Sequence, residues 1–409
     1  MPRSLFIALV TLFVLALVGM AVWFFFFYEA PQRELDTSPT VSDFLPFGKL
    51  REGPGPETSG PGGSAGQALV SGQRSFGSLT RLVAAPVAGF AVNGTTSVRY
   101  MERGTGHVYD VALASGKGER VTNTTIPRVY EALFAEGGAL VVVRYLRDDN
   151  ETIETYSAKI EKGGSGEATE LKGIFLPPNI KDLVVSPDGK KIFYLAAFAG
   201  GAAGFTAAPD NAGKVQVWSS PANEWLAGWG SERALVAATK PSGGVLGFAY
   251  LIDPVRKTAE KLLGGVPGLT ALMAPDGNLV LYGRSDGPTP GLGIYRAKEG
   301  VAAVVGLASF PEKCVWKKDG TKAYCAVPEQ LPAGRYPDAW YQGRVLFSDR
   351  IWEIDALSGD TTFLETLREL SGERVDAVKP ALSSDGKILF FINKKDQSLW
   401  SLKLEGESQ

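Results

Sequence analysis

The sequence predicts an all-β fold from residue 77 to the C-terminus, and three patterns lead to this prediction. Beyond Phe76, short runs of β-branched and aromatic residues alternate with turns rich in Gly, Asp, Asn and Pro. No amphipathic stretch among them is long enough to predict a helix. The turns recur at a spacing of roughly 45 residues, and so do the aromatic residues that follow them.

The first predicted element is a membrane-spanning helix at residues 4–28, which carry no charged side chain. At about 1.5 Å per helical residue this stretch reaches roughly 37 Å and can cross a hydrocarbon layer of about 30 Å. A cleaved signal peptide is the alternative, but the apolar run continues well past the small residues at 19–21. Arg3 precedes the span and acidic residues follow it, so the positive-inside rule predicts a single-pass protein of the cytoplasmic membrane with its N-terminus in the cytosol.

The second predicted element is a flexible linker at residues 29–76, rich in Pro, Gly and Ser. It contains one apolar motif, formed by Phe44, Leu45 and Phe47. This motif is a candidate docking peptide for a groove on a partner. The alternative is that it rests on the membrane interface or on the chain's own globular domain.

The remaining sequence is repetitive, and two sets of markers define the repeats. The turns are Asn93-Gly94, Gly137-Gly138, Asp188-Gly189, Gly230-Ser231, Asp276-Gly277, Asp319-Gly320 and Asp385-Gly386. The aromatic residues that follow them are Tyr109, Tyr156, Phe205, Tyr250, Tyr295, Trp352 and Trp400. Each turn separates a first strand from a second, each aromatic residue marks a third strand, and a fourth strand follows in six of the seven repeats.

A four-stranded repeat of roughly 45 residues is typical of a β-propeller blade. The seventh repeat ends before its fourth strand, whereas residues 78–83 read as a fourth strand without the three that precede it. Pairing residues 78–83 with residues 397–405 would remove two unpaired sheet edges. The sequence therefore predicts a seven-bladed β-propeller at residues 77–409, closed by an N-terminal strand.

Two repeats, "VSPDGKKIFYL" and "MAPDGNLVLYG", resemble the Pro-Asp-Gly repeats of WD40-like β-propellers of the TolB type. The motif specifies a β-turn, because Pro presets φ at the second turn position and Gly accepts the left-handed conformation. TolB-family proteins belong to the cell envelope, so the resemblance implies an extracytoplasmic location. This chain departs from that family in reading as seven blades rather than six, with no α/β domain ahead of them.

Cys314 and Cys325 lie symmetrically about Asp319-Gly320 and are the only cysteines of the chain. In a hairpin centred on Asp319-Gly320 the two thiols face each other, which predicts a disulfide. The alternative is a pair of inert buried thiols. A bulged turn, of the kind that Pro favours, would slip the register by one residue and point the thiols to opposite faces.

Composition argues against several function classes. The 42 basic and 44 acidic side chains are nearly balanced and form no basic block, so we expect no nucleic-acid partner. His107 is the only histidine, which removes most Ser-His, Cys-His and His-metal chemistry. No catalytic, cofactor or metal motif stands out, and we expect none of these groups.

The candidate binding site is an insertion in blade six. In this architecture the loops between second and third strands share one face of the ring, and three of them, in blades three, five and six, are long. The blade-six loop carries aromatic and polar side chains typical of a recognition surface, namely Arg335, Tyr336, Asp338, Trp340, Tyr341 and Arg344. The alternative is a loop that folds over its own blade and buries its aromatic residues.

Together these features predict an extracytoplasmic binding or scaffold module, anchored in the membrane, for an envelope protein or a wall polymer. The alternative is a propeller-type carbohydrate-active enzyme, a lyase or glycosidase, that uses carboxylates of the channel as acid and base.

Overall fold

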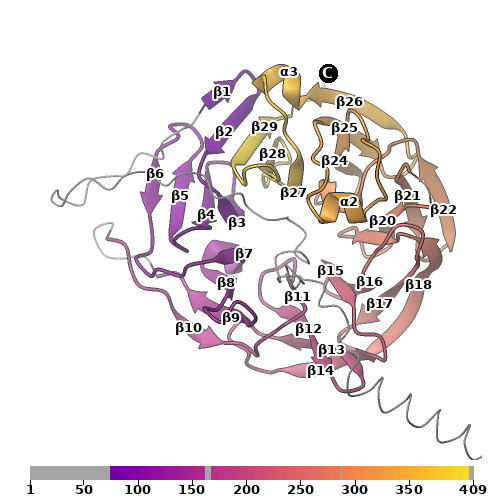
Figure 1. Cartoon of the computed structure of the whole chain (residues 1–409), viewed down its shortest axis with the longest axis horizontal. Coiled ribbons are helices and arrows are strands. Elements are labelled where there is room, and N and C mark those ends of the chain that lie inside the picture. The colour runs from indigo at the N-terminus through magenta and orange to yellow at the C-terminus, as the bar shows by residue number, and fades with distance from the viewer. Residues whose placement is uncertain (1–73, 162–166, 287, 405–409) are drawn as a thin grey trace, which may run out of the picture. The chain divides into compact units, whose positions relative to one another are not determined.

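A computed structural model describes residues 74–161, 167–286 and 288–404. Within these residues the strands form seven antiparallel sheets arranged as a ring (Figure 1). The predicted all-β, seven-bladed propeller is therefore confirmed. The predicted membrane span, most of the linker, and Phe44, Leu45 and Phe47 lie outside the described residues. Inside them no helix is both long and apolar enough to cross a membrane.

The blades follow one another in chain order, each running from an innermost first strand to an outermost fourth strand. Blade one contains β3 (Val87–Asn93), β4 (Ser97–Glu102), β5 (Val108–Ala112) and β6 (Gly118–Arg120). Blade two contains β7 (Val129–Ala135), β8 (Leu140–Leu146), β9 (Ile153–Lys159) and β10 (Lys172–Phe175). Blade three contains β11 (Asp182–Val185), β12 (Ile192–Phe198), β13 (Gly201–Ala207) and β14 (Val215–Ser220). Blade four contains β15 (Trp225–Ser231), β16 (Ala234–Thr239), β17 (Leu246–Asp253) and β18 (Thr258–Pro267).

The other three blades repeat this order. Blade five contains β19 (Thr270–Met273), β20 (Leu279–Arg284), β21 (Gly291–Arg296) and β22 (Val301–Val305). Blade six contains β23 (Cys314–Trp316), β24 (Lys322–Pro328), β25 (Asp349–Asp355) and β26 (Thr361–Thr366). Blade seven contains β27 (Ala377–Leu382), β28 (Ile388–Asn393) and β29 (Leu399–Lys403), completed by β2 (Leu79–Val83) and β1 (Arg74–Phe76). Short helices η2 (Glu136–Gly138), η4 (Pro311–Lys313), α2 (Asp338–Tyr341) and α3 (Leu367–Ser371) lie between strands.

The ring closes as the sequence predicts. Strand β2 pairs with β29 so that Leu79 lies opposite Leu402 and Arg81 opposite Trp400. The Arg81 guanidinium also lies 5.7 Å from the centre of the Trp400 ring. Beyond the prediction, β1 adds a fifth strand outside β2, so the ordered sheet begins within the predicted linker.

The Asp-Gly hairpins of blades three, five, six and seven share one geometry. In each, the Gly N–H donates to a carbonyl three residues earlier, as Gly320 does to Lys317 and Gly189 to Ser186. These glycines have φ between 69° and 73°, a conformation that favours Gly. Because hairpins with and without Pro keep the same register, the slip considered for blade six does not occur.

The blade-four turn lies two residues later than predicted. Ser231 pairs with Ala234, so the turn is made by residues 232 and 233 rather than by Gly230-Ser231. Gly230 is instead required for close packing, since a Cβ there would lie 2.2 Å from Cγ of Met273 in the next blade. The predicted long loop of blade three is also a tight hairpin, because Phe198 pairs with Gly201.

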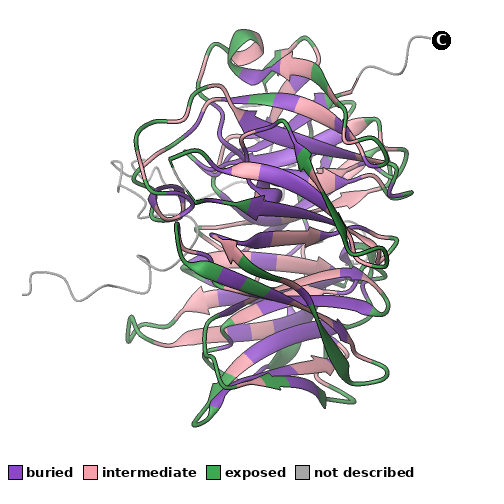
Figure 2. Cartoon of the chain, turned by 90° about the vertical axis from the view of Figure 1, so that its right-hand side faces the viewer, coloured by how far each residue is buried: buried purple, intermediate pink, exposed green. Residues whose placement is uncertain are grey.

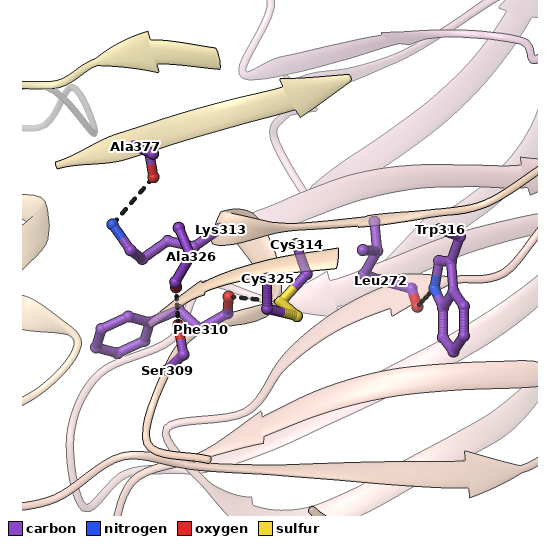
Figure 3. Close-up of a disulfide and its surroundings, with 9 residues drawn as sticks. All are labelled: Leu272, Ser309, Phe310, Lys313, Cys314, Trp316, Cys325, Ala326 and Ala377. Carbon is purple, nitrogen blue, oxygen red and sulfur yellow. Dashed lines mark hydrogen bonds between the residues drawn. A yellow bond between two sulfur atoms is a disulfide. The ribbon is translucent and has the colours of Figure 1, made fainter. Parts of the chain in front are cut away.

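The core consists of the inner strands of neighbouring blades packed face to face. Figure 2 shows buried residues along the middle of the strands and exposed residues at the loops of both faces. The predicted aromatic residues all lie on third strands, and Tyr109 illustrates their role by stacking on Tyr100 of the adjacent strand. The predicted disulfide is confirmed: Cys314 and Cys325 are opposite each other on β23 and β24, bonded and buried (Figure 3).

Candidate functional site

A cavity of about 760 Å³ is lined by residues of blades two, three and four. Its lining comes from the starts of β7, β11 and β15 and from the ends of β8 and β12, with the linking segments between them. These are the parts of each blade that reach the face carrying the loops between second and third strands. The cavity therefore lies on the same face as the blade-six insertion.

Arg144 is a buried charged side chain in the lining of this cavity. It extends from β8, and its Nη1 donates to Oε2 of Glu131 at 2.7 Å. Its Nη2 donates to the carbonyl of Ile180 at 2.6 Å, which ties blade two to the segment entering blade three. The guanidinium also packs over the ring of Tyr130, 5.2 Å from its centre. Arg144 is thus held on three sides and fixes the position of Glu131.

Glu131 is held as a carboxylate. Its second oxygen, Oε1, accepts from Nζ of Lys379 at 3.2 Å. Burial raises the pKa of Glu131, but the charges of Lys379 and Arg144 outweigh burial and hold that pKa below its ordinary value.

Asp182 lines the same cavity, and its pKa is shifted in the opposite direction to that of Glu131. It begins β11, and its Oδ2 accepts from the backbone N–H of Ala227 at 2.7 Å, while Oδ1 accepts from the N–H of Leu183 at 3.0 Å. Burial raises the pKa of Asp182 to about 6, against the lowering effects of the Ala227 N–H and of Arg144. The cavity thus contains two carboxyl groups whose environments move their pKa values apart.

The rim of the cavity is charged and its wall includes apolar groups. Glu224 accepts from Lys240 at 3.1 Å and lies 4.0 Å from Nζ of Lys181. Ala196 and Ala197, at the end of β12, and the buried Trp225 supply apolar surface. A concave site that combines apolar surface with a few fixed polar groups is typical of ligand binding.

The structure separates the six predicted residues of the blade-six insertion into three pairs by their burial. Tyr336 and Trp340 are buried, and Trp340 stacks on Phe310 with ring centres 5.0 Å apart. These two aromatic side chains point into the protein, so they do not face solvent as the side chains of a recognition surface must. Arg335 and Arg344 remain exposed, and Tyr341 and Asp338 are half-buried. The Tyr341 hydroxyl donates to Glu312.

The insertion contacts a loop of blade four that also contributes to the lining of the cavity. Asp338 accepts from the Ser242 hydroxyl at 2.8 Å and from the Gly243 N–H at 2.6 Å, and Nε of Arg335 donates to the Gly243 carbonyl at 2.5 Å. Ser242 and Gly243 belong to the loop after β16, and Lys240 of the same loop borders the cavity. Arg335 and Asp338 therefore position this loop.

The buried charged residues of the cavity lining were not singled out from the sequence, although one signal was present. Arg144 interrupts "LVVVRYL", a strand otherwise apolar enough to be covered on both faces. A charged side chain in such a strand requires a buried partner, and the partner is Glu131, 13 residues away.

Comparison with known proteins identifies the fold but no family. No protein-family model matches the chain, and no curated protein matches it. An oligogalacturonate lyase in complex with manganese is 9% identical, with a TM-score of 0.51 over 82% of this chain and 96% of that one. An oligogalacturonate lyase from Vibrio parahaemolyticus is also 9% identical, with a TM-score of 0.50 over 81% and 94%.

TolB from Acinetobacter baumannii is 13% identical, with a TM-score of 0.43 over 77% of this chain and 78% of that one. The likeness to the two oligogalacturonate lyases shows a shared fold, and at 9% identity it shows nothing about activity. Among the residues described for this chain, no group of three or more His, Cys, Asp or Glu side chains is arranged to hold a metal ion.

Proposed function

We propose that this chain is a membrane-anchored propeller that binds a protein segment or a wall polymer outside the cytosol, and that the cavity between blades two and four is its ligand site. The observation that carries the proposal is the cavity itself, of about 760 Å³ and open to one face. Arg144 is fixed in its lining, and the insertion contacts the loop that contributes Lys240 to that lining. Such a site is preformed, so little ordering is needed when a ligand binds.

The sequence before the propeller supports this role. The uncharged stretch at residues 4–28 is long enough to span a bilayer. The segment that follows has the Pro/Gly/Ser-rich composition of a linker, and a flexible chain of roughly 45 residues would have an average reach of about 35–40 Å. A tethered propeller can therefore sample ligands near the membrane surface.

A photo-crosslinking amino acid placed at position 197 in intact cells tests the proposal. Ala197 lines the cavity and is exposed, so the replacement removes no packed side chain. The matched control is position 255, where Val255 is 55% exposed in the hairpin after β17 on the opposite face. We expect a defined protein or glycan adduct at 197, absent at 255 and lost when Ala196→Trp partly fills the cavity. Equal labelling at both positions contradicts the proposal.

A second candidate function is cleavage of an acidic polysaccharide, with Glu131 as base and Asp182 as acid. Its support is the pair of opposed pKa shifts in one cavity, which is the pattern of an acid and a base. The fold shared with two oligogalacturonate lyases adds to it. Against it, each of the four carboxylate oxygens already has a protein partner.

The two candidates separate in one assay. Incubation with polygalacturonate, followed by ultraviolet absorbance for an unsaturated product and by reducing-end analysis, detects lyase or hydrolase activity. Activity that Asp182→Asn abolishes supports the enzyme. Its absence in the wild type, together with an adduct at position 197, supports the binding module.

A further inference from the structure

A second cluster of charged groups lies where blade six meets blade seven, away from the ligand cavity. Lys313, Asp349 and Asp376 have no exposed side-chain surface. Nζ of Lys313 lies 2.5 Å from Oδ1 of Asp376, 2.8 Å from Oδ2 of Asp349 and 3.0 Å from the carbonyl of Ala377. Figure 3 shows the Lys313 side chain reaching from the end of η4, just before β23, toward Ala377 on blade seven. An amine and a carboxyl group are thus in contact in a site that excludes water.

The other oxygen of Asp376 is held by two N–H donors. Oδ2 accepts from Nε1 of Trp340 at 3.0 Å and from the backbone N–H of Phe347 at 3.0 Å. Two fixed donors aimed at one oxygen polarise the carboxyl carbon and stabilise negative charge that develops on that oxygen during attack at Cγ. Oδ1, which has neither of these donors, faces the amine.

The surroundings of the amine are largely apolar, but the Asp349 and Asp376 carboxylates outweigh burial and hold the pKa of Lys313 above its ordinary value, so the amine is an ammonium before it reacts. Nζ of Lys313 lies 5.1 Å from the ring centre of Trp340 and 5.4 Å from that of Phe347. Burial raises the pKa of Asp349, even against the neighbouring charge of Lys313. Within the part of the chain that the structure describes, Oδ1 of Asp349 is buried and has no hydrogen-bond partner, so this oxygen is available to carry a proton.

We propose that Lys313 and Asp376 form an intramolecular amide bond that covalently joins blade six to blade seven, with Asp349 as the acid–base group. The proposal depends on this buried cluster and is independent of the ligand proposed for the cavity.

The reaction is a condensation and needs no oxidant or further reactant. A proton moves from the Lys313 ammonium to Oδ1 of Asp376, which leaves a neutral amine and a neutral carboxylic acid. Nζ then attacks Cγ of Asp376, and Oδ2 carries the negative charge against Trp340 and Phe347. Asp349 accepts the proton that the nitrogen loses and donates it to the hydroxyl at Oδ1. The Cγ–Oδ1 bond breaks, the Nζ–Cγ bond remains, and one water molecule leaves.

The product satisfies the same buried groups. Its carbonyl oxygen is Oδ2, which keeps the donors from Trp340 and Phe347. Its single N–H has acceptors in Asp349 and in the carbonyl of Ala377. The condensation also removes one buried positive and one buried negative charge, which favours the product in an apolar site. Water excluded from the site cannot readily hydrolyse the bond.

Intact mass spectrometry of the purified, disulfide-reduced and denatured wild-type chain tests the proposal. We expect a mass lower than that of the sequence by one water molecule. Trypsin should then release a branched peptide of residues 299–317 joined to residues 375–387, because a blocked Lys313 resists cleavage. The full sequence mass, or modification of Lys313 by an amine reagent in the unfolded chain, overturns the proposal. A lost water that maps to another pair of residues overturns it as well.

Two variants assign the roles within the cluster. Asp376→Asn should lose ammonia in place of water and give the same final mass as the wild type, because both routes lead to one product. Asp349→Asn keeps an oxygen that can accept from the Ala377 N–H but cannot transfer the proton, so it should retain the full mass. Bond formation in Asp349→Asn at the wild-type rate would exclude Asp349 as the acid–base group.

Discussion

Lys379 on β27 and Glu131 on β7 form an ion pair of 3.2 Å that connects the innermost strands of blades seven and two. Blade one lies between these blades in the ring, so the pair reaches past it. Lys379 sits within the β-bulge of β27 and has φ of 50°, which is unusual for a residue with a side chain. A bulge redirects the side chain, and here it directs the ammonium group to Glu131.

Replacing Lys379 by Met should raise the pKa of Glu131 toward its ordinary value. Of the two positive charges that oppose burial, that of Lys379 lowers the pKa of Glu131 more than that of Arg144 does. Because the wild-type pKa is lowered, Glu131 stabilises the fold above the unfolded-state pKa, and this stabilisation is lost as pH falls through the folded-state pKa. The variant should lose it at a higher pH, in acid titrations followed by circular dichroism and by carboxyl-carbon NMR. An unchanged Glu131 titration contradicts this view of the pair, and Lys395→Met serves as a surface control.

Asp182→Asn should remove a pH dependence of the folding stability that is opposite in sign to that of Glu131. The folded-state pKa of Asp182 is raised to about 6, so between about pH 4 and 6 the folded chain holds a proton that the unfolded chain has released. Stability therefore falls as pH rises through this window, by at most about 3 kcal/mol. Asn keeps an acceptor for the Ala227 N–H but does not ionise. Urea unfolding at several pH values should show a smaller decline for the variant, and equal slopes would refute the assignment.

The propeller was predictable because most of its determinants are local. Asp-Gly turns fix the hairpins, apolar strands fix the buried layers, and the unpaired strand at 79–83 has a complementary edge at the other end of the chain. The disulfide was predictable for the same reason, since Cys314 and Cys325 are brought together by one hairpin. The role of Gly230 was not predictable, because the lack of a side chain there is required by close contact with Met273 of another blade.

The candidate site was less predictable because its contacts are between distant segments. Glu131 and Lys379 are 248 positions apart in the sequence, and no local pattern relates them. The insertion shows a different limit: its composition suits both a recognition surface and a packed loop. The Trp340 ring is buried because Phe310 and Asp376 provide a stacking partner and an acceptor for its N–H, and both come from other parts of the chain.

Removal of the disulfide should destabilise the propeller without unfolding it. The bond closes a short loop, with a sequence separation of 11 between the cysteines, for which the entropic model gives about 3 kcal/mol. We expect the double variant Cys314→Ala/Cys325→Ala to lose about this much free energy of unfolding in urea. Wild-type chain unfolded with reductant and refolded in its presence is the matched control. An unaltered midpoint for both samples would show that the bond does not contribute.

Trp340→Phe should separate the hydrogen bond of this residue from its packing. Phe retains an aromatic ring that can stack on Phe310 but leaves Oδ2 of Asp376 with one fewer donor, at a cost of about 1–3 kcal/mol. Trp340→Ala also loses the packed ring and should cost about 3–5 kcal/mol. Chemical denaturation of the two variants gives both values. Equal losses would mean that the packed ring has no separate effect, and an unchanged stability of Trp340→Phe would mean that the hydrogen bond has none.

Deletion of residues 77–83 should prevent the ring from closing. Leu79, Leu82 and Val83 have exposed fractions of 0%, 1% and 0%, and burial of three such side chains stabilises the fold by roughly 5–9 kcal/mol. That is comparable to the whole stability of a typical domain, and the deletion also exposes the hydrogen-bonding edge of β29. We expect aggregation or loss of the cooperative unfolding transition in calorimetry.

The matched control is deletion of residues 74–76, which removes the exposed outer strand β1 and should leave the transition largely intact. A synthetic peptide of residues 74–83 added during refolding should restore the transition of the longer deletion, because it supplies the missing strand in trans. A chain without residues 77–83 that unfolds like the wild type would mean that β29 needs no partner. The closed ring would then not be what stabilises blade seven, whose strands β27 to β29 would have to form a sheet complete in itself.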